Sequence, residues 1–290
     1  MDFIMDFLAK PFGVVMSFIY EILAFENYGL AIILFTIFVR LLLFPLTLKQ
    51  QKSMVMTQKI QPELEALRQS YGNDSQGLME AQQKLYAKYN VNPMAGCLPM
   101  LIQLPIFLVV YRIISEPLIY ISKLSVDTVS ALQKLFADSL GSGYAQIELN
   151  SLLHGDASAV AKAVENGINV DAGSFFDMTF LKIFDLGVAP WQCISQKEWQ
   201  YWPLLLIPFV MLGTQYIMQM ISQPKKKKDK KNEDPTMRSM NLMMKMMPLM
   251  TFVIAFIAPA GLGFYWTIGN LLSMLQTVII NKFFIKKKED

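Results

Sequence analysis

Five apolar runs, each about as long as a membrane-spanning helix, constrain the fold of this chain more than any other feature. A helix needs about 20 apolar residues to cross a hydrocarbon core of ~30 Å. The 290-residue chain is 53% hydrophobic and only 17% charged, which is too apolar for an ordinary soluble domain. We therefore expect an all-α membrane protein with five transmembrane helices. The runs are residues 28–48, 97–118, 201–221, 243–258 and 262–284.

Residues 1–26 carry a weaker apolar signal with two interpretations. Small or polar residues, among them Gly13 and Ser17, recur on one face at helical spacing, and large apolar residues lie largely opposite. We interpret the segment as an amphipathic helix in the membrane interface, with a bend at Pro11. A secretory signal would begin with basic residues, whereas this segment begins with aspartates. The alternative is a sixth span, which would place both termini in the cytoplasm.

Basic residues gather on one side of the predicted spans. Residues 50–92, 222–242 and 286–290 are rich in lysine or arginine, whereas acidic residues outnumber basic ones in 119–200. Because basic loops stay in the cytoplasm, we expect the N-terminus outside, the C-terminus inside and 119–200 as an external segment. The run PKKKKDKK is interpreted as a loop near anionic lipid, so we expect no recognition of nucleic acid.

These features divide the chain into predicted regions. Residues 50–92 contain two apolar stripes at helical spacing, separated by the turn signal YGND, which predicts an antiparallel helical hairpin in the cytoplasm. The hairpin is either an inert connector or an element that docks or moves. The regions are 1–26 (interfacial helix), 27–118 (two spans with the hairpin at 50–92), 119–200 (external segment), 201–285 (three spans with the basic loop 222–242) and 286–290 (charged tail).

Arg40 lies in the middle of the first apolar run, in FTIFVRLLLFPLTLKQQKS. An ionisable residue inside a span costs roughly 2.5 to 3.5 kcal/mol on insertion scales, so it normally faces protein or water and has a partner. None of the five runs has a carboxylate in its interior, and Glu116 lies only at the outer end of the second. We therefore predict that Arg40 faces a water-containing cavity and attracts an anionic group. The alternative is a side chain that snorkels to the headgroups over roughly 12 Å of helix.

Neutral polar residues in the runs are candidates to line the same cavity. In the last run, Trp266, Asn270 and Ser273 share one helical face. For any single residue the alternative is a hydrogen bond that holds two helices together. The wider polar set is Thr36, Gln103, Thr214, Gln215, Gln219, Thr251, Asn270, Ser273, Gln276 and Thr277. The predicted substrate-binding groove consists of Arg40, Thr36, Gln103, Gln215, Trp266, Asn270 and Ser273.

The residue inventory argues against an enzyme. The single histidine, His154, lies in the external segment, which excludes an HExxH metalloprotease and a histidine-dependent serine protease within the membrane. The sequence has no GxSxG motif, phosphate-binding glycine loop or paired catalytic carboxylates. It also has neither the buried acids nor the inverted repeat of many ion-coupled transporters. We expect no catalytic residue, no metal site and no cofactor.

Three stretches of the chain closely resemble the signature spans of the YidC family of membrane protein insertases, which are related to mitochondrial oxidase-assembly and chloroplast Albino proteins. They are YGLAIILFTIFVRLLLFPLTLKQQKSM, GCLPMLIQLPIFLVVYR and MPLMTFVIAFIAPAGLGFYWTIGNLLSMLQ. FLKIFDLGVAP resembles the segment before the third span. The resemblance covers residues 27–118 and 180–285, while 119–179 is longer than the common short form. It implies a five-helix core around a hydrophilic groove, open to the cytoplasm and to lipid, with Arg40 at the groove arginine's position.

The same resemblance implies an activity and partners. In the family's proposed mechanism, the groove draws in the hydrophilic tail of a nascent membrane protein and releases the adjoining hydrophobic segment into the bilayer, without ATP. The implied protein is an insertase and folding chaperone of the bacterial cell membrane, and its partners are nascent membrane proteins and lipid. Ribosome and Sec translocon contacts stay open. The alternatives are a channel or transporter for a small anion and a scaffold for membrane-protein assembly.

Overall fold

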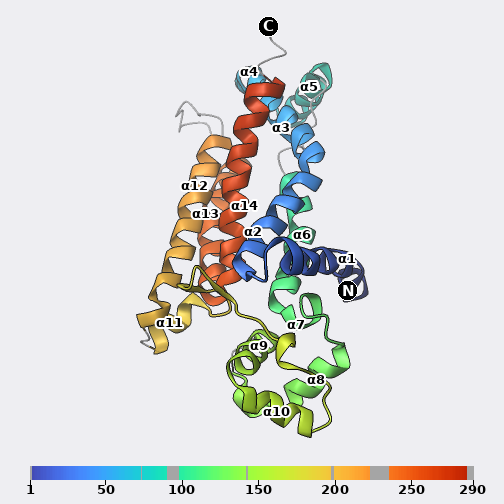
Figure 1. Cartoon of the computed structure of the whole chain (residues 1–290). Coiled ribbons are helices and arrows are strands. Elements are labelled where there is room, and N and C mark those ends of the chain that lie inside the picture. The colour runs from blue at the N-terminus through green and yellow to red at the C-terminus, as the bar shows by residue number, and fades with distance from the viewer. Residues whose placement is uncertain are drawn as a thin grey trace. The chain divides into compact units, whose positions relative to one another are not determined.

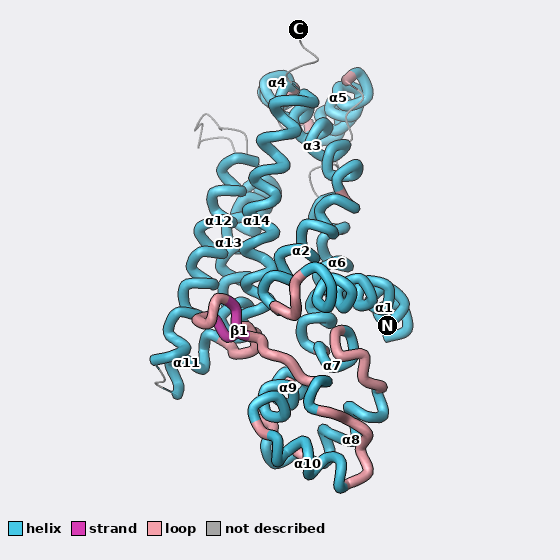
Figure 2. The backbone as a smooth tube through the Cα atoms, viewed as in Figure 1, coloured by secondary structure: helices cyan, strands magenta, loops and turns pink. Residues whose placement is uncertain are grey.

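The computed structural model of the chain is nearly all helical over the residues that it describes, which confirms the expected all-α class (Figures 1 and 2). These residues are 2–72, 74–89, 98–141, 143–196, 199–222 and 235–285. Three features of the sequence lie wholly or mostly outside them: Cys97 at the start of the second run, the basic loop 222–242, and the tail 286–290. The chain separates into two compact units. The first comprises Met1–Val39 with Phe107–Leu272, and the second Arg40–Ile106 with Ser273–Asp290.

Three long helices of the first unit lie side by side (Figures 1 and 2). Phe209 and Phe252 join α12 to α13, with ring centroids 5.3 Å apart. The chain turns between α13 and α14 at Pro259, because proline cannot donate the hydrogen bond that would continue the helix. The first amides of α14 donate to carbonyls after the β-hairpin, including Gly261 to Leu186 at 2.8 Å. The helices are α12 (Leu206–Ser222), α13 (Pro235–Ile257) and α14 (Ala260–Ile280). Helix α14 belongs to the first unit as far as Leu272; its remaining residues and η6 (Asn281–Ile285) belong to the second.

Only part of the predicted set of spans passes a test of length and apolarity. In the described residues, Tyr201–Ile221 and Ala260–Ile285 are long and apolar enough to cross a membrane. The pair formed by α2 (Tyr28–Leu42) and α3 (Phe44–Lys59) would count as a third span if it is taken as one broken helix. Leu104–Ser115 of α6 (Leu98–Ser115) and Lys245–Ile257 are shorter apolar helices. The predicted count of five is therefore not confirmed.

The first apolar run does not form the straight helix over 28–48 that its composition suggests. Helices α2 and α3 meet at an angle of 62°, with the break at Leu43. Pro45, in the first turn of α3, explains the bend, because its ring cannot donate a hydrogen bond and clashes with the preceding turn. Because the residues on both sides of the break are apolar, hydrophobicity alone does not reveal the break.

The N-terminal segment forms α1 (Asp2–Phe18), followed by the π-helical turn η1 (Ile19–Leu23), and Pro11 lies inside α1. Gly13 and Ser17, on the face with small or polar residues, are both buried, and a Cβ at Gly13 would overlap the ring of Tyr120. Phe7 and Val14 are instead 71% and 68% exposed. The small residues of this face therefore permit close packing within the chain, and the placement of the helix in the membrane interface stays a prediction.

Residues 117–175, to which the sequence assigned no fold, form a compact helical region with its own apolar core. Two of its helices begin at polar caps: Ser125 accepts from the Thr128 amide, and Asp156 from the Ser158 amide. The elements are α7 (Pro117–Tyr120), α8 (Val126–Leu135), η3 (Ala137–Ser139), α9 (Ala145–Gly155), α10 (Ala157–Glu165) and η4 (Ala172–Ser174). The buried core is Leu118, Val129, Leu132, Phe136, Leu149, Leu153, Ala159, Val160, Ala163, Val170 and Phe175. We call this the outer helical region.

A short antiparallel hairpin follows, formed by β1 (Thr179–Phe180) and β2 (Phe184–Asp185). It is the only sheet in the part of the chain that the structure describes. Figure 2 shows the hairpin beside α11, near the ends of the long helices. The chain then continues through α11 (Pro190–Gln196) and the 3₁₀ segment η5 (Trp199–Leu205) into α12.

In the second unit, α4 (Gln61–Tyr71) and α5 (Ser75–Lys88) pair through the two apolar stripes that the sequence shows. The buried core of the pair is small: Ile60, Leu64 and Leu85. At the open end, the Glu63 carboxylate accepts from the Tyr89 hydroxyl and lies 3.8 Å from the Lys88 ammonium.

Candidate functional site

Polar side chains join the three long apolar helices of the first unit. Thr251 of α13 donates to Gln215 of α12 at 2.7 Å. Asn270 of α14 donates to the hydroxyl of Thr214 on α12 at 3.3 Å. Gln215 and Asn270, both predicted groove residues, are partly exposed. These bonds match the alternative of hydrogen bonds between helices, and the partial exposure keeps both side chains accessible.

Two other predicted residues of this unit have different surroundings. Thr36 is only 1% exposed, and its hydroxyl donates to the Ile32 carbonyl of its own helix at 2.6 Å. Trp266 stacks on Phe107 of α6, with ring centroids 5.1 Å apart and planes within 13°. The hydroxyl of Thr36 is thus committed to a local bond, and Trp266 presents a half-buried aromatic surface rather than a polar one.

The second unit contains Arg40, Ser273 and Gln103. The Arg40 carbonyl accepts from the Gln276 side-chain amide at 3.2 Å, and the residue is partly exposed. Arg40 takes part in a further interaction within the chain, and its predicted role in attracting an anionic group stays a prediction. Ser273 is half-buried one turn from Gln276 on α14. Gln103 lies in α6, and its side chain is outside the described part.

Gln276 belongs to the wider polar set but was not included among the predicted groove residues. Its Oε1 is buried, and among the described residues no donor reaches it. A buried acceptor without a donor is costly, which makes this position suited to a water or to a donor group of a bound chain. The signal available in the sequence was its spacing from Ser273 on the same helix, close to one turn.

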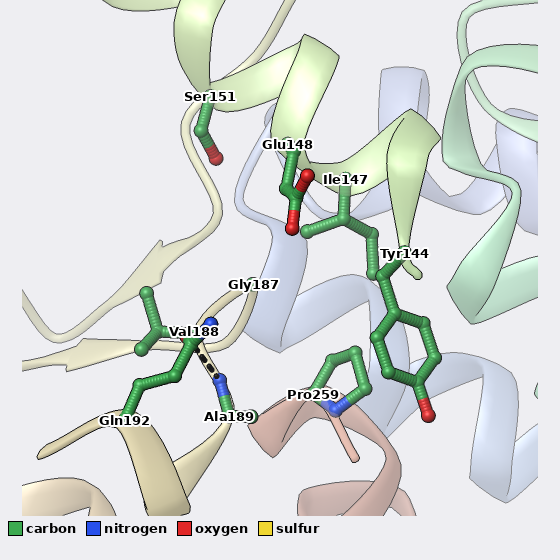
Figure 3. Close-up of a pocket in the computed structure, with 9 residues that line it drawn as sticks. All are labelled: Tyr144, Ile147, Glu148, Ser151, Gly187, Val188, Ala189, Gln192 and Pro259. Atoms are coloured by element: carbon green, nitrogen blue, oxygen red, sulfur yellow. Dashed lines mark hydrogen bonds between the residues drawn. The ribbon is translucent and has the colours of Figure 1, made fainter. Parts of the chain in front are cut away.

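A separate cavity of about 200 Å³ lies in the first unit between α9 and the turn at Pro259 (Figure 3). Two of its polar side chains are engaged: Glu148 accepts from the Gly141 amide at 2.9 Å, and Gln192 accepts from the Ala189 amide at 3.3 Å. Burial, with a hydrogen bond that the Tyr144 hydroxyl donates to Tyr111, raises the pKa of Tyr144 to about 12. Ligand sites usually measure roughly 300 to 1,000 Å³, and we assign no ligand to this one.

Long apolar helices joined by partly buried polar contacts are typical of a helical membrane protein. The family described as 60Kd inner membrane protein matches residues 18–288, and the chain belongs to it. A membrane protein insertase YidC from Oceanobacillus iheyensis is 31% identical over 268 residues, covering 91% of this chain and 78% of that protein.

Longer relatives carry the same name. The membrane protein insertase YidC of Rhizobium meliloti is 30% identical over 277 residues, covering 95% of this chain but 36% of that protein. That of Campylobacter jejuni is 27% identical over 282 residues, covering 97% of this chain and 39% of the relative. The chain thus spans little more than a third of these longer relatives, and the match reaches well beyond the stretches that first suggested the family.

Proposed function

We propose that this protein is an insertase and folding chaperone for membrane proteins. It takes hydrophilic tails of nascent chains into a polar groove open to the cytoplasm and releases hydrophobic segments into the bilayer, without ATP. The observation that carries the proposal is the match to the Oceanobacillus insertase, which extends over most of both chains. Its partners are nascent membrane proteins and lipid, with ribosome and Sec contacts left open.

Polar groups within apolar helices support this proposal. Gln215 and Asn270 in the first unit, and Arg40 and Gln276 in the second, put hydrogen-bonding capacity into helices that are otherwise apolar. A charge at membrane depth costs roughly 2.5 to 3.5 kcal/mol unless water or protein surrounds it. Such polar groups can form hydrogen bonds with a hydrophilic segment as it crosses the membrane and so lower this cost. Arg40 is proposed to attract acidic tails.

The proposal includes five spans with the N-terminus outside and the C-terminus in the cytoplasm. The α2–α3 pair, α6, the Tyr201–Ile221 segment, α13 and α14 would form them, and α1 would lie in the interface. Helix α6 has 18 residues, so it reaches about 27 Å at the helical rise, close to the hydrocarbon thickness. Its length therefore supports a crossing with little tilt.

Reconstitution tests the function against its rivals. We expect purified protein in vesicles to insert a single-span substrate with an acidic tail, while an encapsulated small anion is retained. Solute flux without insertion would support a channel instead. Stable complexes with membrane proteins and no insertion would support a scaffold. Empty vesicles and vesicles with an unrelated helical membrane protein serve as controls.

A further inference from the structure

The tip of the β-hairpin exposes large apolar side chains. Leu181 is 63% exposed and Ile183 is 53% exposed, with the exposed Lys182 between them. The residues before and after the tip are paired across the hairpin, since Phe180 faces Phe184 in the register. Exposed large aliphatic residues at a loop tip are a cost in water unless they meet an apolar surface.

The backbone of the tip is also unfavourable for its residues. Leu181 and Lys182 have φ angles of 54° and 58°, and the Ile183 amide donates to the Phe180 carbonyl at 3.2 Å. This is the geometry of a turn that normally takes Asn-Gly, because both central residues are left-handed. Side chains other than Gly, Asn or Asp in that conformation cost about 1 to 2 kcal/mol each. The chain thus keeps Leu and Lys where other residues would be more stable.

The hairpin sits at the level where the apolar helices end. The Phe180 ring packs 5.2 Å from Phe264, about one turn into α14, and it would overlap a Cβ at Gly29, the second residue of α2. Nearby, Trp191 of α11 packs 6.0 Å from Phe256, one residue before the end of α13, and is itself 52% exposed. Exposed tryptophan at the ends of apolar helices is typical of the membrane interface.

We propose that the tip of the hairpin, Leu181 to Ile183, inserts into the bilayer interface and anchors the start of α14 at a fixed depth. The two aliphatic side chains enter the acyl region, and the Lys182 ammonium reaches lipid phosphates. The occupant is lipid because the tip is continuous with the apolar helices that the proposed function, on which this inference rests, places in the bilayer. Hydrogen bonds from Ala260 and Gly261 to Val188 and Leu186 connect the hairpin to α14.

The test places a fluorescent NBD label at the tip of the full-length protein in vesicles of phosphatidylethanolamine and phosphatidylglycerol. The label is attached to Ile183→Cys in a Cys97→Ser background, and Cys193, which is fully buried, stays in place. The matched control is Val164→Cys on α10, because Val164 is also 53% exposed and lies in the same segment. Unsubstituted background protein measures stray labelling.

We expect dithionite to reduce the label at 183 at least about fivefold more slowly than at 164, since burial of the aliphatic side chain that remains, Leu181, still favours insertion. Spin-labelled acyl chains should quench the label at 183 and not at 164. Equal dithionite rates would overturn the proposal. So would protection at 183 without lipid quenching, which would indicate a protein contact.

A second variant separates insertion from folding. Leu181→Asn with Lys182→Gly gives the turn its preferred residues, so the thermal stability in detergent should stay the same or rise. In vesicles, the same change should expose the label at 183 to dithionite at the rate seen at 164. A label that stays protected in this variant would overturn the role assigned to the tip.

Discussion

The outer helical region and the α4–α5 hairpin are both helical, and both connect apolar helices in the sequence. They differ in how many apolar side chains they bury. Among the described residues, the outer helical region has eleven buried residues in one cluster, whereas the hairpin has three. A segment with so small a core opens locally at low free-energy cost, while a larger core holds one arrangement. We therefore expect the outer helical region to resist local opening and the hairpin to open readily.

The largest expected effect comes from truncating the two cores. Leu132→Ala in α8 should destabilise the outer helical region by about 2 to 5 kcal/mol, because the side chain is fully buried. Leu64→Ala in α4 should cost less, because the small core can collapse around the gap. Hydrogen exchange of the reconstituted protein measures both. Equal losses of protection in the two regions would contradict the expected difference in stability between them.

A smaller effect is expected from the buried amide of Asn150. Its Nδ2 donates to the Phe176 carbonyl at 2.7 Å, and its Oδ1 accepts from the Phe176 amide at 3.1 Å. Asn150→Ala leaves both backbone groups buried without partners and should cost about 1 to 3 kcal/mol. Asn166→Ala, at an exposed amide that bonds only the Lys162 carbonyl, is the control and should change thermal stability little.

Asp185 at the end of β2 gives the first unit a pH dependence. Burial raises the pKa of this carboxyl, despite a hydrogen bond from the Gly187 amide. Its stabilising contribution is therefore complete below the ordinary pKa of 3.8 and is lost as pH rises through the higher folded value. Asp185→Asn should gain stability relative to the wild type between about pH 4 and pH 7. Melting temperatures with the same difference at every pH would contradict this.

The smallest effect is expected at the exposed ion pair of the hairpin. Glu63 and Lys88 side chains are 45% and 66% exposed, so Glu63→Gln should cost at most about 1 kcal/mol. High salt should remove most of the difference, because it screens exposed charges. A salt-independent loss would mean that the Tyr89 hydrogen bond, rather than the charge, holds the hairpin closed.

The sequence predicted the features that depend on composition and periodicity. Apolar runs indicated an all-α membrane protein, and the stripes containing Leu64 and Leu85 indicated the paired helices. It missed features that depend on single residues in a three-dimensional setting. Pro45 bends the first apolar run although the run stays apolar on both sides of the break. The close contact between Gly13 and Tyr120 was also missed, because the sequence does not say whether a small residue is exposed or closely packed.

The predicted groove shows the same limit. Polar residues in apolar helices are easily found in a sequence, but the sequence does not say which bond each side chain makes. Thr36 bonds its own helix, and Trp266 stacks on Phe107, while Gln276 holds a buried acceptor that was left out. The role of the groove residues, Arg40 above all, stays a proposal.

The insertion activity of Arg40 variants tests the central claim most directly. Wild type, Arg40→Ala, Arg40→Glu and Arg40→Lys are reconstituted and given two single-span substrates that differ only in whether the tail is acidic or neutral. We predict that Arg40→Ala and Arg40→Glu insert the acidic substrate at least about fivefold more slowly, in keeping with the loss of one charge interaction in a partly aqueous site. Arg40→Lys should retain most activity, and the neutral substrate should respond little. Insertion of both substrates at the wild-type rate by all three variants would contradict the account.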